Sequence, residues 1–166
     1  IQDIPDPDWM LKPQVQWAYE AIIANDLTFD ALGYPIHLER FRAIFEQFPS
    51  MRAVIDHAMK PAIREGGFDD WADGMTRMAQ NTTACCKLSG LANEAGADWN
   101  EQALEPYFAH LLSVFGPQRL MWGSDWPVLE LAGSYDQWHA VARALVPAAH
   151  AAQVFGGTAA RFYRLQ

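Results

Sequence analysis

The residues with the clearest chemical potential are an aspartate and a histidine that each follow a short apolar run. Asp125 follows LMW in the segment RLMWGSDWPV, and His57 ends the run RAVIDH. A carboxylate can take a proton from water while a histidine polarises a carbonyl group, so together they suit hydrolysis. Taken singly, Asp125 is typical of a turn and His57 of a structural histidine. Their pairing therefore depends on whether the fold brings the two runs together.

Further polar side chains fall at or just after the apolar runs: Asp3, Lys60, Lys87, Ser89 and Trp126. Lys87 stands inside CCKLSG, where its ammonium must point out of an otherwise apolar strand; the alternative is a strand-end lysine that extends into solvent. Trp126 could stack on the ring of a ligand. Because active sites are built at the carboxyl ends of parallel strands, the coincidence of these groups predicts a site at that edge.

The elements that must position these residues alternate along the chain. Strands are expected within 27–35, 52–61, 83–91 and 119–128, and Ile1–Gln2 reads as the stub of a fifth. Helical stripes are expected over 15–22, 38–48, 71–79, 104–115 and 138–145, the third of them capped by Asp69 or Asp70. A last short helix is expected with Thr158 near its N-cap. This β-α alternation predicts an α/β fold with a parallel sheet in one unit, residues 1–166.

Two architectures fit such alternation. A doubly wound open sheet could be complete at 166 residues, but the chain has no glycine-rich phosphate loop of the G-x-G-x-x-G or Walker type. A (β/α)₈ barrel needs roughly 250 residues, so five βα units could form only part of one.

Composition excludes several classes of protein. The net charge of −8 disfavours nucleic acid as a partner, and no stretch has the roughly 20 apolar residues of a membrane span. The adjacent cysteines, Cys85 and Cys86, are expected to be reduced core residues. With no signal peptide evident, we expect a cytoplasmic protein.

Four segments together resemble one known family. VIDHAMKP, CKLSGL, RLMWGSDWPV and FGGTAARFY occur in the order and spacing of the amidohydrolase superfamily, in its amidohydrolase 2 branch. That branch includes sugar-lactone hydrolases of the fuconolactonase and rhamnonolactonase type. The resemblance implies a (β/α)₈ TIM-barrel fold, with residues 1–166 as its C-terminal portion and the last five βα units.

The resemblance also implies roles for particular residues. Asp125 matches the general base, and His57 matches a histidine that polarises the carbonyl or binds a metal. The residues expected to contact substrate are Lys87, Lys60, Trp126, Gln2 and Asp3. The implied substrate is a lactone or sugar acid.

Metal content and completeness stay open at this stage. The family's first strand carries a His-x-His pair, and the sequence has none. His57 and Asp125 alone are fewer than the three or four protein ligands of a usual zinc site. We therefore expect either one divalent metal, with zinc as the first candidate, or no metal. A decarboxylase and an inactive fragment are the alternatives to a lactonase. The expected partner is then a missing N-terminal segment or a second copy of the chain.

Overall fold

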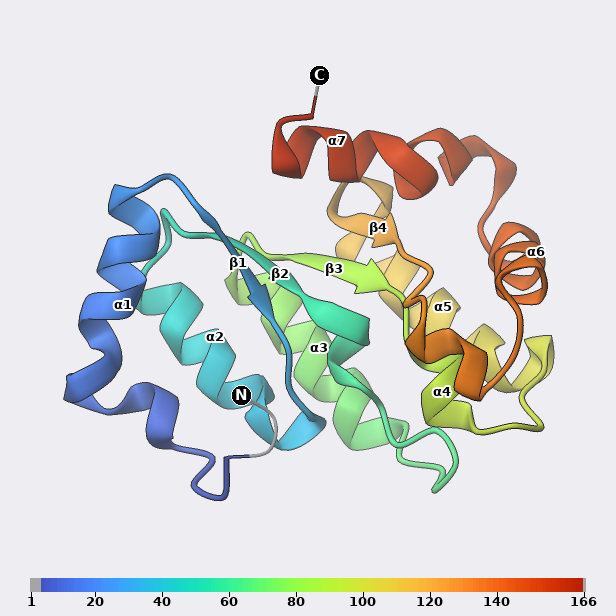
Figure 1. Ribbon diagram of the computed structural model, residues 1–166, viewed down its shortest axis with the longest axis horizontal. Helices are drawn as coiled ribbons and strands as arrows, with labels where there is room; N and C mark the ends of the chain where they lie inside the picture. Colours follow the sequence, from blue (N-terminus) through green and yellow to red (C-terminus); the bar gives the residue numbers. More distant parts are fainter. Residues whose placement is uncertain (1–3, 166) are drawn as a thin grey trace.

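Four short strands form one parallel sheet in the order β1-β2-β3-β4 (Figure 1). The computed structural model describes residues 4–165, and the strands within them are β1 (Thr28–Ala31), β2 (Arg52–Ile55), β3 (Cys85–Leu88) and β4 (Leu120–Trp122). Ala31 lies opposite Ile55 and Leu88 lies opposite Trp122. The α/β prediction is therefore confirmed with four strands, while the expected stub at Ile1–Gln2 lies outside the described residues.

Helices connect the strands, and each predicted helical stripe is a helix. The bounds are α1 (Pro13–Ala24), α2 (Leu38–Gln47), α3 (Asp69–Asn81), α4 (Leu91–Ala95), α5 (Glu101–Phe115), α6 (Tyr135–Leu145) and α7 (Thr158–Tyr163). Pro13 begins α1, where its fixed φ and missing N–H are tolerated. The side chains of Asn100 and Ser134 cap α5 and α6.

The prediction that Asp69 or Asp70 caps α3 is wrong, whereas the prediction that Thr158 lies near the N-cap of α7 is confirmed. Asp69 and Asp70 lie in the first turn of α3, after the N-cap residue Phe68, whose side chain makes no capping hydrogen bond. Thr158 is the first residue of α7, and its hydroxyl donates to the Pro117 carbonyl at 2.8 Å. A π-helical turn, Gln153–Gly157, runs directly into α7, whose N-cap residue is Gly157. Thr158 therefore ties α7 to the segment before β4.

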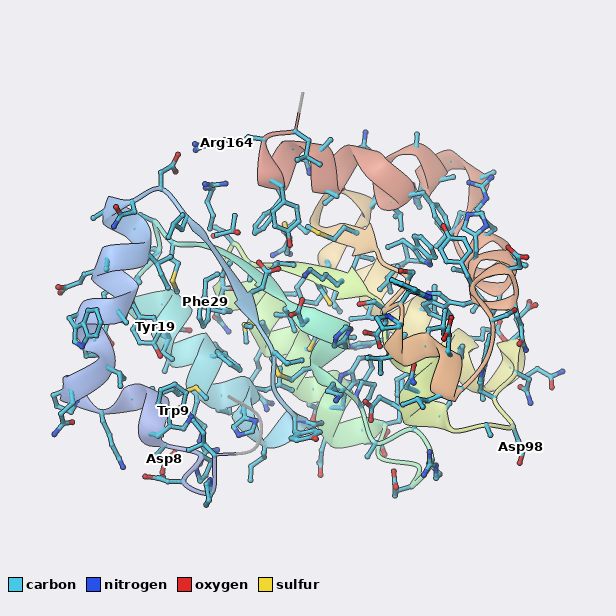
Figure 2. The ribbon with its side chains drawn as sticks, in the orientation of Figure 1. Asp8, Trp9, Tyr19, Phe29, Asp98 and Arg164 are labelled. Carbon is cyan, nitrogen blue, oxygen red and sulfur yellow. The ribbon has the colours of Figure 1, made fainter. Side chains whose placement is uncertain are left out.

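One face of the sheet packs against α2, α3 and α5 and forms the main core. We call it the helix-covered face; it comprises Phe29, Ala31, Ala53, Ile55, Cys86, Leu88 and Leu120. Alternate residues of a strand point to opposite faces, so these side chains share one side. Figure 2 shows Tyr19 of α1 beside Phe29 of β1, with ring centroids 5.9 Å apart. This continuous apolar layer fixes the helices to the sheet.

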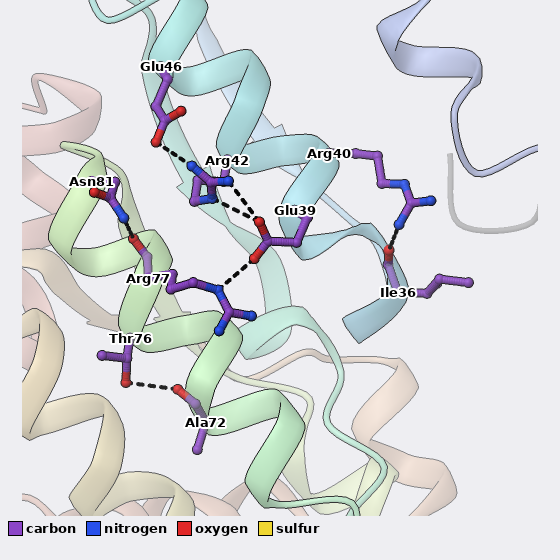
Figure 3. A network of polar contacts seen from close by, with 9 residues as sticks. All are labelled: Ile36, Glu39, Arg40, Arg42, Glu46, Ala72, Thr76, Arg77 and Asn81. Atoms are coloured by element: carbon purple, nitrogen blue, oxygen red, sulfur yellow. Dashed lines mark hydrogen bonds and ion pairs between the residues drawn. The ribbon is translucent and has the colours of Figure 1, made fainter.

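At the surface, α2 and α3 are also joined by charged side chains (Figure 3). Glu39 accepts hydrogen bonds from Arg42 on its own helix and from Arg77 on α3, the latter at 2.8 Å. Arg42 also donates to Glu46. The Arg77 and Glu39 side chains are 50% and 45% exposed, so solvent screens this network strongly.

The opposite face, which we call the α7 face, comprises Asp30, Val54, Asp56, Cys85, Lys87 and Met121. Its apolar members pack with Ala159, Phe162 and Tyr163, so α7 crosses this side of the sheet, as Figure 1 shows. Cys85 and Cys86 are both buried and free, as predicted. Within residues 4–165, no helix has the length and apolar character needed to cross a membrane.

Candidate functional site

The sheet brings His57 and Asp125 to the same edge. His57 follows β2 and Asp125 follows β4, and Nε2 of His57 lies 3.5 Å from Oδ1 of Asp125. Their side chains are 21% and 14% exposed. Both line a cavity of about 230 Å³ whose walls are Leu32, His57, Lys60, Asn93, Glu94, Asp125 and Val128. A distance of 3.5 Å exceeds an ordinary N–H···O bond, so each side chain keeps hydrogen-bonding capacity for a ligand.

The backbone that carries His57 is left-handed over four consecutive residues. The φ angles are 51° at His57, 48° at Ala58, 59° at Met59 and 50° at Lys60. None of these residues is glycine, and each left-handed residue costs roughly 1–2 kcal/mol. The indole of Trp71, in α3, donates to the Ala58 carbonyl at 2.7 Å, and Ala58 and Met59 are fully buried. Tertiary packing therefore holds a turn that the local sequence does not favour.

The segment KLSG contacts the His57 ring at Nδ1, the nitrogen opposite the one that faces Asp125. The Ser89 hydroxyl lies 2.9 Å from Nδ1 of His57. Gly90 has a φ of 71°, and a Cβ built on it would lie 2.8 Å from Cβ and Cγ of His57. If the Ser89 hydroxyl donates its proton to Nδ1, a neutral His57 carries its own proton on Nε2. Nε2 is the ring nitrogen that faces Asp125. Ser89 is only 2% exposed, so it suits orienting His57 rather than attacking a substrate.

The loop after β4 turns sharply to present Asp125. Asp125 has a φ of 59°, and its carbonyl accepts the Leu129 N–H at 2.9 Å. The Trp126 N–H donates to the Ser124 hydroxyl, and the Trp126–Pro127 peptide bond is cis. A Cβ at Gly123 would approach Cβ of Ser89 to 3.3 Å, so the glycine lets this loop lie close to KLSG.

Polar groups from α4 form another part of the cavity wall. Lys60 Nζ lies 3.5 Å from Glu94 Oε1 and 5.1 Å from the centroid of the Tyr34 ring. The Asn93 amide donates to the Val128 carbonyl at 2.8 Å. Donors and acceptors thus line the cavity together, which suits a ligand with several hydroxyl groups.

Lys87 lies on the α7 face and is not one of the residues lining this cavity. Its Nζ lies 2.7 Å from Asp30 Oδ2 and 2.6 Å from Asp56 Oδ1, and Tyr163 also donates to Asp30. Burial alone would lower the pKa of Lys87, but hydrogen bonds to Asp30 and Asp56 and their negative charge outweigh it and raise that pKa. Lys87 is therefore a fixed cation held between two strands.

The remaining predicted contacts lie apart from the cavity wall or beyond the described residues. Trp126 is 65% exposed and its indole donates to Glu130 at 2.9 Å. Gln2 and Asp3 lie outside the described residues. The structure thus brings His57, Asp125 and Lys60 to one cavity and places Lys87 and Trp126 elsewhere.

The cavity offers few ligands for a zinc ion. His57 and Asp125 supply one nitrogen and one carboxylate, both of which zinc accepts. Within residues 4–165, no three His, Cys, Asp or Glu side chains are grouped closely enough to hold a metal. Two donors do not fit a zinc site, which usually has three or four protein ligands.

Sequence reasoning missed several residues of this edge. Ser89 was noted only as a polar residue at a strand end, and Asn93 and Glu94 were not singled out. Asp30 and Asp56, the partners of Lys87, were also missed. An asparagine and a glutamate three and four positions after the strand-end segment KLSG were the available signal, because residues that follow a parallel strand lie near the edge where sites are built.

Comparison with known proteins gives these residues a context. The amidohydrolase family matches residues 3–165. An L-fucono-1,5-lactonase of Burkholderia ambifaria is 43% identical over 173 residues, covering 99% of this chain and 59% of that protein. The chain thus spans about 60% of the length of this curated relative.

Solved structures agree with the fold. A Burkholderia multivorans amidohydrolase with bound zinc superposes with a TM-score of 0.92 at 33% identity, covering 99% of this chain and 62% of that one. This agreement confirms the α/β fold and is consistent with part of a barrel. The 5-carboxyvanillate decarboxylase of Sphingomonas paucimobilis has a TM-score of 0.63 at 19% identity, a likeness of fold alone.

Proposed function

Because this chain belongs to the amidohydrolase family, we propose that the protein hydrolyses the lactone of a sugar acid. The observation that carries the proposal is the His57–Asp125 pair, 3.5 Å apart in a cavity with polar walls. The similarity to an L-fucono-1,5-lactonase supports the substrate class. On this proposal residues 1–166 are the C-terminal portion of a barrel, whose other strands complete the site.

Asp125 acts as the general base. It takes a proton from water as the water oxygen attacks the ring carbonyl carbon, and the carbonyl becomes an oxyanion. The Nε2–H of His57 donates to that oxyanion, since Ser89 holds the opposite ring nitrogen. The carbon–oxygen bond of the ring then breaks, and Asp125 returns its proton to the departing oxygen. The product is a hydroxy acid, and one water is consumed.

A decarboxylase is the second candidate, but no contact within the cavity favours it. Lys60, a cation that lines the cavity, lies 3.5 Å from the Glu94 carboxylate, whose negative charge offsets its own. The related decarboxylase shares only the fold. A pH-indicator assay for released acid and an assay for released CO₂ distinguish the two reactions.

The decisive experiment uses the natural full-length protein with a panel of 1,4- and 1,5-lactones of sugar acids. We expect acid release from at least one lactone, and a loss of about 10²- to 10⁴-fold in kcat for Asp125→Asn. Asp98→Asn, which changes an exposed carboxylate in the same way, is the matched control and should leave kcat unchanged. A wild-type protein that opens no lactone in the panel would refute the function. Near-normal turnover by Asp125→Asn would refute only the assigned base.

A further inference from the structure

Within the described residues, the Asn93 side-chain amide makes a hydrogen bond through its nitrogen but not through its oxygen. Its Nδ2 donates to the Val128 carbonyl at 2.8 Å, while its Oδ1 is buried with no hydrogen-bond partner. The assignment of the two amide atoms follows from the contact, because a carbonyl can only accept. An unpaired buried acceptor costs about 1–3 kcal/mol, so this oxygen has a strong need for a donor.

The used half of the amide holds the loop that carries Asp125. Three side-chain N–H groups donate to carbonyls of this loop: Asn93 to Val128, Trp99 to Ala132 and Trp138 to Gly123. The two tryptophans are buried in the core, whereas Asn93 lines the cavity. Asn93 is therefore the one of these three donors whose side chain borders the cavity.

The surroundings of Asn93 indicate what the missing donor is. A neutral amide oxygen accepts from a hydroxyl but gains nothing from a carboxylate, which has no proton to donate. Lys60 and Glu94 lie in the same cavity and add one donor and one acceptor. These groups together match a chain or ring that bears several hydroxyls.

We propose that Asn93 recognises a hydroxyl group of the lactone through Oδ1 and, through Nδ2, positions the Asp125 loop. This inference rests on the proposed function and adds to it a specificity-determining residue. The substrate hydroxyl that binds Oδ1 fixes the Asn93 amide, and the same amide restrains the loop that carries Asp125. Substrate selection and the placement of Asp125 are therefore coupled through one side chain.

Two substitutions separate the two roles. Asn93→Asp keeps the size and an acceptor oxygen but loses the donor, and it sets a negative charge against the Val128 carbonyl. Asn93→Leu removes both functions at similar size. Asn81→Asp is the matched control: Asn81 donates to the Arg77 carbonyl at the same 2.8 Å (Figure 3) and is not one of the residues lining this cavity.

The measurement is kcat and KM for the natural full-length protein with a sugar lactone and with analogues that each lack one hydroxyl. We expect wild type to prefer the parent lactone over one particular deoxy analogue by about tenfold or more, the size of one hydrogen bond. Asn93→Leu should abolish that one preference and leave the others. Asn93→Asp should lower kcat for parent and analogue alike, and Asn81→Asp should change neither value. Thermal unfolding checks that each variant is folded.

The outcomes keep the two proposals apart. If wild type opens lactones but Asn93→Leu keeps every preference, the role of Asn93 is overturned while the function stands. If wild type opens no lactone, the proposed function is refuted, and calorimetric binding of gluconate to wild type and Asn93→Leu decides the rest. Equal binding by both proteins, or binding by neither, overturns the role of Asn93. Weaker binding by the variant supports it.

Discussion

The two faces of the sheet are built from alternate residues of the same four strands, yet they differ in kind. The helix-covered face joins α2, α3 and α5 in one apolar cluster. The α7 face has a small apolar cluster under α7 and, beside it, Lys87 between Asp30 and Asp56. The helix-covered face therefore holds the larger apolar cluster, while the α7 face accommodates charge close to the edge that carries His57 and Asp125.

The largest effect on stability should come from the helix-covered face. Leu88 is fully buried in the main cluster, so Leu88→Ala should cost about 2–5 kcal/mol of unfolding free energy in chemical denaturation. Met121→Ala, on the α7 face, is the matched truncation and should cost less, because its cluster is small. Equal costs would mean that the two faces contribute alike.

A smaller effect is expected when the central cation of the α7 face is removed. Lys87→Met leaves Asp30 and Asp56 without the ammonium between them and should cost about 1–3 kcal/mol at neutral pH. The pKa of Lys87 is raised on folding, so its contribution is complete at all pH values below the ordinary lysine pKa and is lost only above it. Denaturation at pH 7 therefore reports the whole effect. Lys87→Arg should retain most of the stability, and a loss as large as that of Lys87→Met would show that charge is not what matters.

Two tyrosines, one near each face of the sheet, allow the pH dependence of stability to be compared between the faces. Burial raises the pKa of Tyr19, beside the helix-covered face, to about 12. Burial and a hydrogen bond to Asp30 raise the pKa of Tyr163, on the α7 face, to about 12. A raised folded pKa means that the folded protein binds more protons, so stability should fall as pH rises between about 10 and 12. Tyr19→Phe and Tyr163→Phe should each flatten this fall, measured by denaturation across the range. A slope unchanged in both variants would contradict the assignment.

The smallest effect should come from the surface network between α2 and α3. Arg77→Ala breaks the bond to Glu39, and both side chains are about half exposed, so the cost should be about 0–1 kcal/mol and fall further in high salt. The loss of stability in Arg77→Ala can be compared directly with that in Lys87→Met, because each variant removes a cation that is paired with carboxylates. A cost above that of Lys87→Met would contradict the view that enclosure on the α7 face makes the difference.

The helices and strands were predictable where local pattern and tertiary packing agree. The apolar stripe of Leu38, Phe41, Ile44 and Phe45 predicted α2, and these residues are buried in the core. The meeting of His57 and Asp125 followed from parallel strands ending at one edge. Asp69 and Asp70 were misassigned as caps because aspartate is favoured both at the N-cap and in the first helical turn, where the two residues lie.

Other features of the site depend on contacts that a sequence does not display. Lys87 precedes the last residue of β3, so strand alternation turns it to the α7 face, where Asp30 lies 57 positions away in sequence. The role of Asn93 depends on a carbonyl 35 residues further along the chain. Contacts between residues so far apart in sequence can be identified only from the folded structure.

The left-handed turn at His57–Lys60 bears on how this site could be moved to another protein. The turn is held by Trp71 from α3, while Ser89 and Gly90 after β3 fix the histidine ring. A graft of the segment DHAMK alone would relax to right-handed or extended backbone, because nothing local favours φ near 50° in four non-glycine residues. The transferable unit is therefore three separate pieces of chain, and any engineered host must supply all of them.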